Sequence, residues 1–186
     1  RAARGTDGGC PAATFCAEGR EALSGRRLRA LAVTMGADGP RLWASGDQGT
    51  LLRGTGGRWT AVPVGEGAGA VKEKLAALWL NGAEEPWLVG GGGLVLRRSV
   101  SNGQGRFQQQ LVPGAPTLTG LWRGETLWVT SKDGVVFYEA EGRFSPISLS
   151  EKKKVYYGVV GRREGREDTV FLAGQIGRAS CRERVS

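Results

Sequence analysis

The chain has 186 residues and a formal net charge of +8, with 40% hydrophobic and 24% charged residues. This balance is typical of a folded globular protein and excludes an intrinsically disordered chain. Gly, Arg, Asp or Glu interrupts every apolar run, so that none reaches the roughly 18 residues needed to span a bilayer as a helix. The sequence contains no His, which excludes Ser-His-Asp and Cys-His catalysis and every His-containing metal site within it. We therefore predict no catalytic, cofactor-binding or metal site and no cofactor.

The first segment, residues 1–27, carries none of the repeated landmarks described below. It contains Cys10 and Cys16, separated by five residues, which is too isolated a pair for a four-thiolate metal site. The two cysteines form a disulfide if the protein is exported and remain free thiols if it is not. The segment itself is a linker, the end of a preceding repeat unit or a loop closed by that disulfide.

From residue 28 onward, three landmarks recur in one phase. An aromatic residue closes a short apolar run at Trp43, Trp87, Trp128 and Phe171, at spacings of 44, 41 and 43. A turn glycine follows it at Gly49, Gly93 and Gly134, and a Gly-Arg-aromatic motif ends at Trp59, Phe107 and Phe144. A leucine pair opens each unit, at Leu28 and Leu31, Leu75 and Leu78, Leu118 and Leu121, with Tyr156 and Val159 in the fourth. Three landmarks in one phase indicate internal repetition with a period of roughly 43 residues.

Each unit predicts four short strands. In the first unit they cover residues 29–34, 41–45, 50–53 and 58–62, and in the third unit residues 119–122, 126–130, 135–139 and 143–147. Four strands in about 43 residues is the size of a β-propeller blade. We predict an all-β partial propeller of about 3.5 four-stranded antiparallel blades, at residues 28–67, 75–114, 118–150 and, incompletely, 155–175. The landmark aromatics are then expected to be buried between blades.

One stretch favours helix. Residues 70–80, AVKEKLAALWL, are rich in good helix formers. The repeat register requires a strand from Leu75 onward, so we expect a helical turn only at Val71–Lys74.

The string LWASGDQGTLLRGTGGRWTAV, residues 42–62, resembles the propeller repeats of the YCF48-like and BNR type, within the WD40/YVTN/BNR-like group. The resemblance covers about residues 28–175. It implies a bacterial propeller of six or seven blades, located outside the cytoplasm, that serves as a binding or assembly module. The expected partner is a protein or a glycan, and the remaining blades of the same chain would close the ring.

Related BNR propellers include sialidases, whose Asp-box is a structural turn. Ser45, Asp47 and Gly49 match the first part of that motif, whereas Leu51 and Leu52 replace its closing Thr-Trp. In such a turn the Asp side chain caps backbone amides. The alternative to a non-catalytic module is therefore a fragment of a sialidase-like or other glycoside-cleaving propeller, with its catalytic residues in the missing part.

Two further features concern charge and the C-terminal end. Basic residues cluster at Arg26, Arg27 and Arg29 and at Lys152–Lys154, but no aromatics alternate with them for base stacking, so we predict no nucleic-acid partner. Residues 176–185, IGRASCRERV, resemble a translated sequencing adapter. We expect residues 176–186 to be non-native, which removes three Arg and one Glu and lowers the net charge from +8 to +6.

Overall fold

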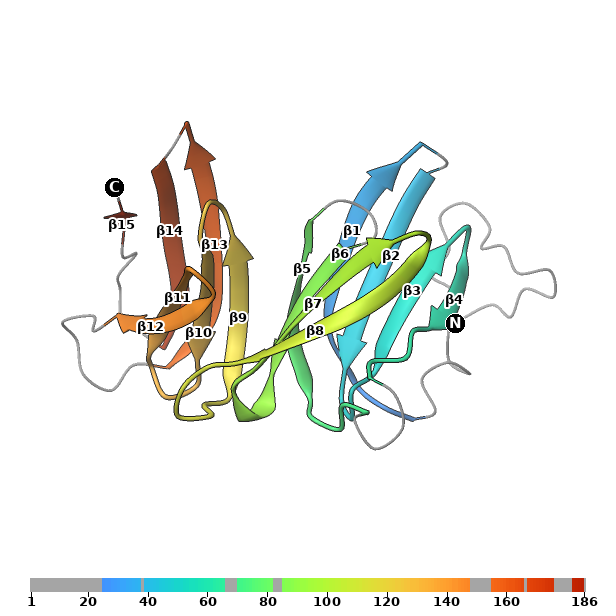
Figure 1. Ribbon diagram of the computed structural model, residues 1–186, viewed down its shortest axis with the longest axis horizontal. Helices are drawn as coiled ribbons and strands as arrows, with labels where there is room; N and C mark the ends of the chain where they lie inside the picture. The colour runs from blue at the N-terminus through green and yellow to red at the C-terminus, as the bar shows by residue number, and fades with distance from the viewer. Residues whose placement is uncertain are drawn as a thin grey trace, which may run out of the picture.

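The computed structural model describes residues 25–37, 39–65, 70–81, 85–147, 155–165 and 167–175, together with the backbone of 182–185. The described residues form four antiparallel sheets that follow one another along the chain (Figure 1). Within the described part there is no α-helix, and so none that could cross a membrane. The predicted all-β propeller architecture is confirmed.

The first sheet contains β1 (Leu28–Gly36), β2 (Gly39–Gly46), β3 (Leu51–Thr55) and β4 (Arg58–Ala61). The second contains β5 (Leu75–Asn81), β6 (Glu85–Gly90), β7 (Leu94–Ser101) and β8 (Gln104–Leu111), with the short 3-10 turn η2 (Gly91–Gly93) between β6 and β7. The third contains β9 (Leu118–Arg123), β10 (Leu127–Ser131), β11 (Val136–Ala140) and β12 (Arg143–Ile147). The fourth contains β13 (Tyr156–Glu164), β14 (Glu167–Gly174) and β15 (Arg182–Val185).

The strands of each sheet are hydrogen-bonded in chain order. The first strands of consecutive sheets, β1, β5, β9 and β13, lie next to one another, and the later strands of each sheet extend away from them (Figure 1). This is the arrangement of propeller blades around an axis, and we call the four sheets blades 1 to 4.

A β-bulge near the start of the first strand recurs in all four blades. It lies between Leu28 and Ala30, Leu75 and Ala77, Leu118 and Gly120, and Tyr156 and Gly158. In a regular strand, residues three apart point to opposite faces, but one extra residue restores them to the same face. The bulge therefore places both members of each leucine pair on one side of the sheet.

Each blade consequently has two different apolar faces. We call one of them the Leu face, because it carries the leucine pair. In blade 2 the second residue of that pair, Leu78, lies beside Leu88 and Leu96 on the neighbouring strands. We call the other the Trp face, because it carries the landmark aromatic residue. In the same blade Trp87 lies there between Trp79 and Arg97 of the neighbouring strands.

The three hydrophobic clusters lie where the Trp face of one blade meets the Leu face of the next. Trp43 and Leu51 of blade 1 pack with Leu75, Leu88 and Leu96 of blade 2. The next two junctions repeat this arrangement, with Trp87 against Leu118, Leu121 and Val129, and Trp128 against Tyr156, Val159 and Val170. The repeat is therefore directional, because every junction uses the same two unlike faces.

Two expectations from the sequence are corrected. No helical turn forms at Val71–Lys74, because the backbone there bonds to other segments: Val71 N donates to Val64 O, and the carbonyl of Glu73 accepts from Gly49 N. The second correction concerns Phe171, which is 41% exposed rather than buried between blades, since no described blade covers its face.

Truncating the landmark tryptophan of a junction should destabilise the protein strongly. Trp43 is fully buried, and we expect Trp43→Ala to lower the free energy of unfolding by about 3–5 kcal/mol. Trp59, half-buried on the outer strand β4, is the matched control, and Trp59→Ala should cost about 1–2 kcal/mol. Urea denaturation monitored by circular dichroism measures both; equal losses would contradict the assignment of Trp43 to the junction core.

Candidate functional site

In blades 1 to 3 the turns between the second and third strands lie at the same end as the segments that lead into the next blade, because the strands alternate in direction. We call this the glycine-turn end; it is the lower edge of Figure 1. Here the residue after the second strand, or its equivalent, donates its N–H to the carbonyl of the residue just before the first strand. The four bonds are Asp47 N to Arg27 O at 2.9 Å, Gly91 N to Lys74 O at 3.1 Å, Lys132 N to Thr117 O at 2.8 Å and Gln175 N to Val155 O at 2.8 Å.

This bond explains one glycine of the repeat. A Cβ at Gly46, Gly90 or Gly174 would overlap the accepting carbonyl oxygen of Arg27, Lys74 or Val155. In blade 3 the equivalent position is Ser131, whose Oγ instead accepts from Val135 N at 3.1 Å.

The landmark turn glycines join one blade to the next. Gly49 N donates to Glu73 O at 2.8 Å, and Gly93 N donates to Pro116 O at 2.7 Å. Both glycines have a positive φ, 64° and 70°, and a Cβ at Gly49 would overlap the carbonyl oxygen of Val71. Gly49 is thus required both by backbone conformation and by the close approach of the segment that leads into blade 2.

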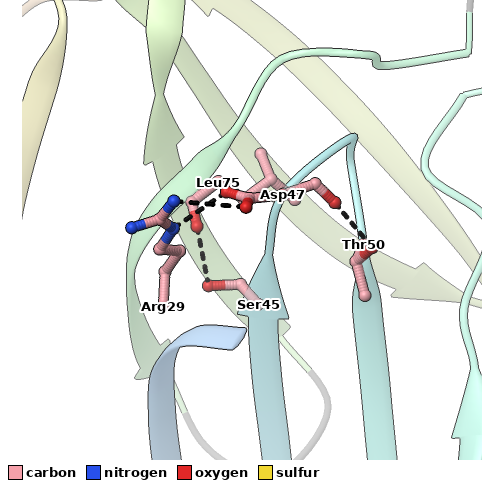
Figure 2. Close-up of polar contacts among 5 residues, drawn as sticks. All are labelled: Arg29, Ser45, Asp47, Thr50 and Leu75. Atoms are coloured by element: carbon pink, nitrogen blue, oxygen red, sulfur yellow. Dashed lines mark hydrogen bonds and ion pairs between the residues drawn. The ribbon is translucent and has the colours of Figure 1, made fainter. Parts of the chain in front are cut away.

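The Asp-box-like residues lie around this turn, as Figure 2 shows. Ser45 is buried and its Oγ donates to Leu75 O across the blade junction at 3.3 Å. Thr50 closes the turn, since its N–H and its Oγ1 both donate to Asp47 O, at 3.1 and 2.6 Å. The carboxylate of Asp47 accepts from Arg29 Nε at 2.8 Å and from Arg29 Nη2 at 3.1 Å. The side chain of Asp47 thus binds an arginine where the Asp-box comparison led us to expect backbone amides.

This ion pair affects the titration of Asp47. The hydrogen bonds from Arg29 hold the pKa of Asp47 below its ordinary value, although partial desolvation acts in the opposite direction, and the charges of Arg29, Arg27 and Lys74 add to the lowering. The same pair raises the pKa of Arg29. Both groups of the pair are therefore charged near neutral pH, where Asp47 has no proton to donate.

Arginines lie over the landmark tryptophans, a feature that the sequence analysis missed. Arg98 of blade 2 lies 5.5 Å from the ring centroid of Trp43 in blade 1, and Arg123 of blade 3 lies 4.5 Å from that of Trp87 in blade 2. Arg97 lies 5.3 Å from the same Trp87 ring. The contacts of Arg98 and Arg123 cross the blade junctions and place guanidinium groups in structural roles, as cation–π partners.

Asp168, also missed, joins blades 3 and 4 at the opposite end. It is 4% exposed, and its Oδ2 accepts from the backbone N–H groups of Glu125 and Thr126 at 2.8 and 3.3 Å. Gly124 makes room for the carboxylate, since a Cβ there would overlap it. Arg163 adds an ion pair with Glu125. The signal in the sequence was the acidic pair Glu167 and Asp168, just before the apolar run Val170–Ala173.

The remaining landmarks are placed as follows. Trp43, Trp87, Trp128 and Phe144 are buried, and Trp59 and Phe107 are half-buried on the fourth strands. Gly134 lies in the turn before β11, where its N–H donates to Ser131 O at 3.2 Å. Cys10, Cys16 and Lys152–Lys154 lie outside the described residues.

A cavity of about 720 Å³ opens at the glycine-turn end of blade 1. Ala61, Val62 and Pro63 line it with accessible apolar surface, and the exposed side chains of Arg26 and Lys72 contribute positive charge to its lining. In the described ranges, no three His, Cys, Asp or Glu side chains are grouped so as to hold a metal ion. The cavity offers shape and charge for binding.

Substituting Gly49 tests the close approach of the next blade. Gly49→Ala should lower the free energy of unfolding by about 3 kcal/mol or more, because it combines backbone strain with overlap of the Val71 carbonyl. Gly56→Ala is the matched control: φ is +57° there but no atom lies within 4 Å, so that only the conformational cost of about 1–2 kcal/mol remains. Thermal unfolding of both variants would separate the conformational and steric contributions. Equal losses of stability in the two variants would refute the steric contribution.

The ion pair should be visible in the titration of Asp47. Its carboxyl 13C resonance should report a pKa below the ordinary value of about 3.9, rising toward that value in Arg29→Gln. Since the pKa is lowered in the folded state, the pair contributes stability above the unfolded-state pKa and loses it as pH falls through the folded-state pKa. Asp47→Asn should lack this acid-dependent loss; an unshifted pKa in the parent protein would contradict the pairing.

Comparisons with known proteins support the fold. No family model and no curated protein sequence matches this chain. Sixteen chains of solved structures do match, among them YCF48 from Cyanidioschyzon merolae, with a TM-score of 0.53 and 14% sequence identity over 76% of this chain and 47% of that one. The matched part thus spans about half the length of that structure. At this identity the likeness concerns the fold alone, and it shows that the chain has the fold of part of a YCF48-type β-propeller.

Proposed function

We propose that this protein is a non-catalytic binding or assembly module that presents the loops of its glycine-turn end to a protein or glycan partner. The observation that carries the proposal is the cavity of about 720 Å³ at that end, with its apolar lining and cationic side chains. A propeller fold suits such a role in general, because its blades form a rigid support for loops whose sequences can vary.

Several polar and aromatic side chains of the blades already serve a structural purpose. Trp43 and Trp87 are covered by neighbouring blades and arginines, Ser45 and Asp168 bond across junctions, and Asp47 is paired with Arg29. By contrast, Arg26 and Lys72 are exposed at the cavity. Side chains free to meet a partner are thus found on the loops rather than on the blade faces between sheets.

The chemistry of the cavity favours a ligand that combines acidic groups with a small apolar surface. Arg26 and Lys72 supply the positive charge, and Ala61, Val62 and Pro63 supply the accessible apolar contact. An acidic peptide segment or an acidic glycan satisfies both requirements. We also propose a location outside the cytoplasm, supported by the resemblance of residues 42–62 to repeats of extracytoplasmic propellers.

Probing the full chain on peptide and glycan arrays that include acidic members tests this proposal. We expect binding to acidic probes that weakens with added salt and falls roughly tenfold or more in Arg26→Glu/Lys72→Glu. Arg58→Glu, an exposed substitution at the start of β4 near the other end of the blade, is the matched control and should bind as the parent does. Absence of any hit, or equal losses in both variants, would refute the assignment.

A further inference from the structure

The outer strand of blade 2 is longer than the outer strands of blades 1 and 3. β8 has eight residues, whereas β4 has four and β12 has five. It is the last strand of its sheet and pairs with β7 without a register shift. Blade 2 has a neighbouring blade on each face, and β8 lies on the side of the blade away from the first strands (Figure 1). The exposure of this edge is therefore independent of where the chain begins and ends.

The backbone groups of β8 alternate between the two sides of the strand. The turn before it, Asn102–Gly103, has positive φ values of 52° and 75°, as in a two-residue hairpin turn whose flanking residues, Ser101 and Gln104, are a hydrogen-bonded pair. The even-numbered residues of β8 therefore bond to β7. The residues whose N–H and C=O groups point away from β7 are Gly105, Phe107 and Gln109. Within the described part of the chain, no backbone hydrogen bond engages these outward groups.

Proline interrupts the corresponding outward positions much earlier in the other two outer strands. The turns before β4 and β12, Gly56–Gly57 and Glu141–Gly142, also consist of two residues with positive φ, so that the same alternation follows. Pro146 occupies the second outward position of β12 and Pro63 the third outward position after the turn in blade 1. In blade 2 the first proline, Pro113, comes only at the fifth. A proline offers no N–H to an added strand and protects a sheet edge, and β8 lacks this protection.

A second cavity, of about 770 Å³, adjoins the first half of β8. It lies between this strand and the segment after β4, and its lining residues are Gln104, Gly105, Arg106, Phe107, Pro63 and Gly65. The β7–β8 hairpin, residues 94–111, contains three Arg and no Asp or Glu. The charge of this edge therefore favours an added strand with acidic side chains over a second copy of the same hairpin, which would bring like charges together.

We propose that the outward edge of β8 binds an extended acidic peptide segment of a partner protein, which adds to blade 2 as a fifth, antiparallel strand. Its backbone bonds to the outward groups of Gly105, Phe107 and Gln109. Its acidic side chains lie on the side of Arg106, and its apolar side chains on the other side contact Phe107 and Leu111, which is 61% exposed. This site does not rest on the proposed function, although its cavity shares Pro63 and Gly65 with the cavity of that function.

The probe for this site is the capped, fluorescent peptide Thr-Val-Glu-Val-Thr-Val-Glu-Val-Thr, titrated against the full chain by anisotropy. As a strand it has one face with both Glu and one face of Val. We expect binding that weakens roughly tenfold or more when Lys replaces both Glu. N-methylation of the two central Val, whose N–H groups face β8 in the proposed pairing, should abolish binding, whereas N-methylation of the two Glu should preserve it. Equal effects of the two methylations would overturn the proposal.

Substitutions at position 109 separate the backbone contact from the side chain. Gln109→Pro removes one outward N–H and should weaken binding of the peptide roughly tenfold or more, while the bonds of Gln108 and Gln110 to β7 remain. Gln109→Thr is the matched control, because it changes the side chain but keeps the N–H, and it should bind as the parent does. Arg106→Glu should reverse the preference, so that the Lys peptide binds better than the Glu peptide. Circular dichroism of each variant verifies that the blades are folded.

Amide hydrogen exchange of the parent chain, measured by NMR, gives a readout that does not depend on any variant. The peptide should slow exchange at Gly105, Phe107 and Gln109 and leave the even-numbered residues of β8, already bonded to β7, little changed. Absence of this alternation would overturn the proposal. A peptide that binds Gln109→Pro as tightly as the parent but not Arg26→Glu/Lys72→Glu would occupy the cavity of the proposed function instead. A dimer of the parent chain that Gln109→Pro dissociates, without binding of the peptide, would assign the edge to a second copy and would equally overturn it.

Discussion

The structure depends on one constraint: a four-stranded blade has two apolar faces, and neither can be left in water without loss of stability. Burying one tryptophan removes on the order of 200 Å² from water, which contributes roughly 5 kcal/mol as an upper value. Trp43, Trp87 and Trp128 each obtain this contribution from the Leu face of the next blade. No blade can obtain it alone, so stability belongs to the junctions more than to the individual sheets.

Polar groups at the junctions determine how the blades are aligned. Apolar packing alone would allow one sheet to slide on another, whereas a hydrogen bond requires one register. Ser45 bonds to the Leu75 carbonyl, Thr119 Oγ1 donates to the Tyr156 carbonyl at 2.6 Å, and Gly49 bonds to the Glu73 carbonyl. Asp168 performs the same task at the other end of the sheets. Unpaired, these buried groups would each cost about 1–3 kcal/mol, so the aligned arrangement is favoured over displaced ones.

The directional faces connect this architecture to assembly. Because every junction joins a Trp face to a Leu face, an array of blades has two different ends and can close only by joining one end to the other. At the glycine-turn end, Val64 and Gly49 take part in this packing, whereas the side chains of Arg26 and Lys72 remain exposed. Closure thus rests on the blade faces, and the exposed loop side chains at the glycine-turn end can vary without disturbing it.

The sequence by itself determined the repeat, its four-strand units and the aromatic landmarks, because apolar alternation and turn glycines are local signals. It did not reveal why the leucine pairs are three residues apart, since the bulge that aligns them is set by pairing with the second strand. It also favoured a helical turn at Val71–Lys74, where backbone bonds to Val64 and Gly49 impose an extended path. Asp168, the arginines over Trp43 and Trp87, and the exposure of Leu31 and Val160 were decided only by the tertiary structure. Each depends on which blade lies beside which. The residues that meet at a blade junction are far apart in the chain, and no local sequence pattern indicates their contact.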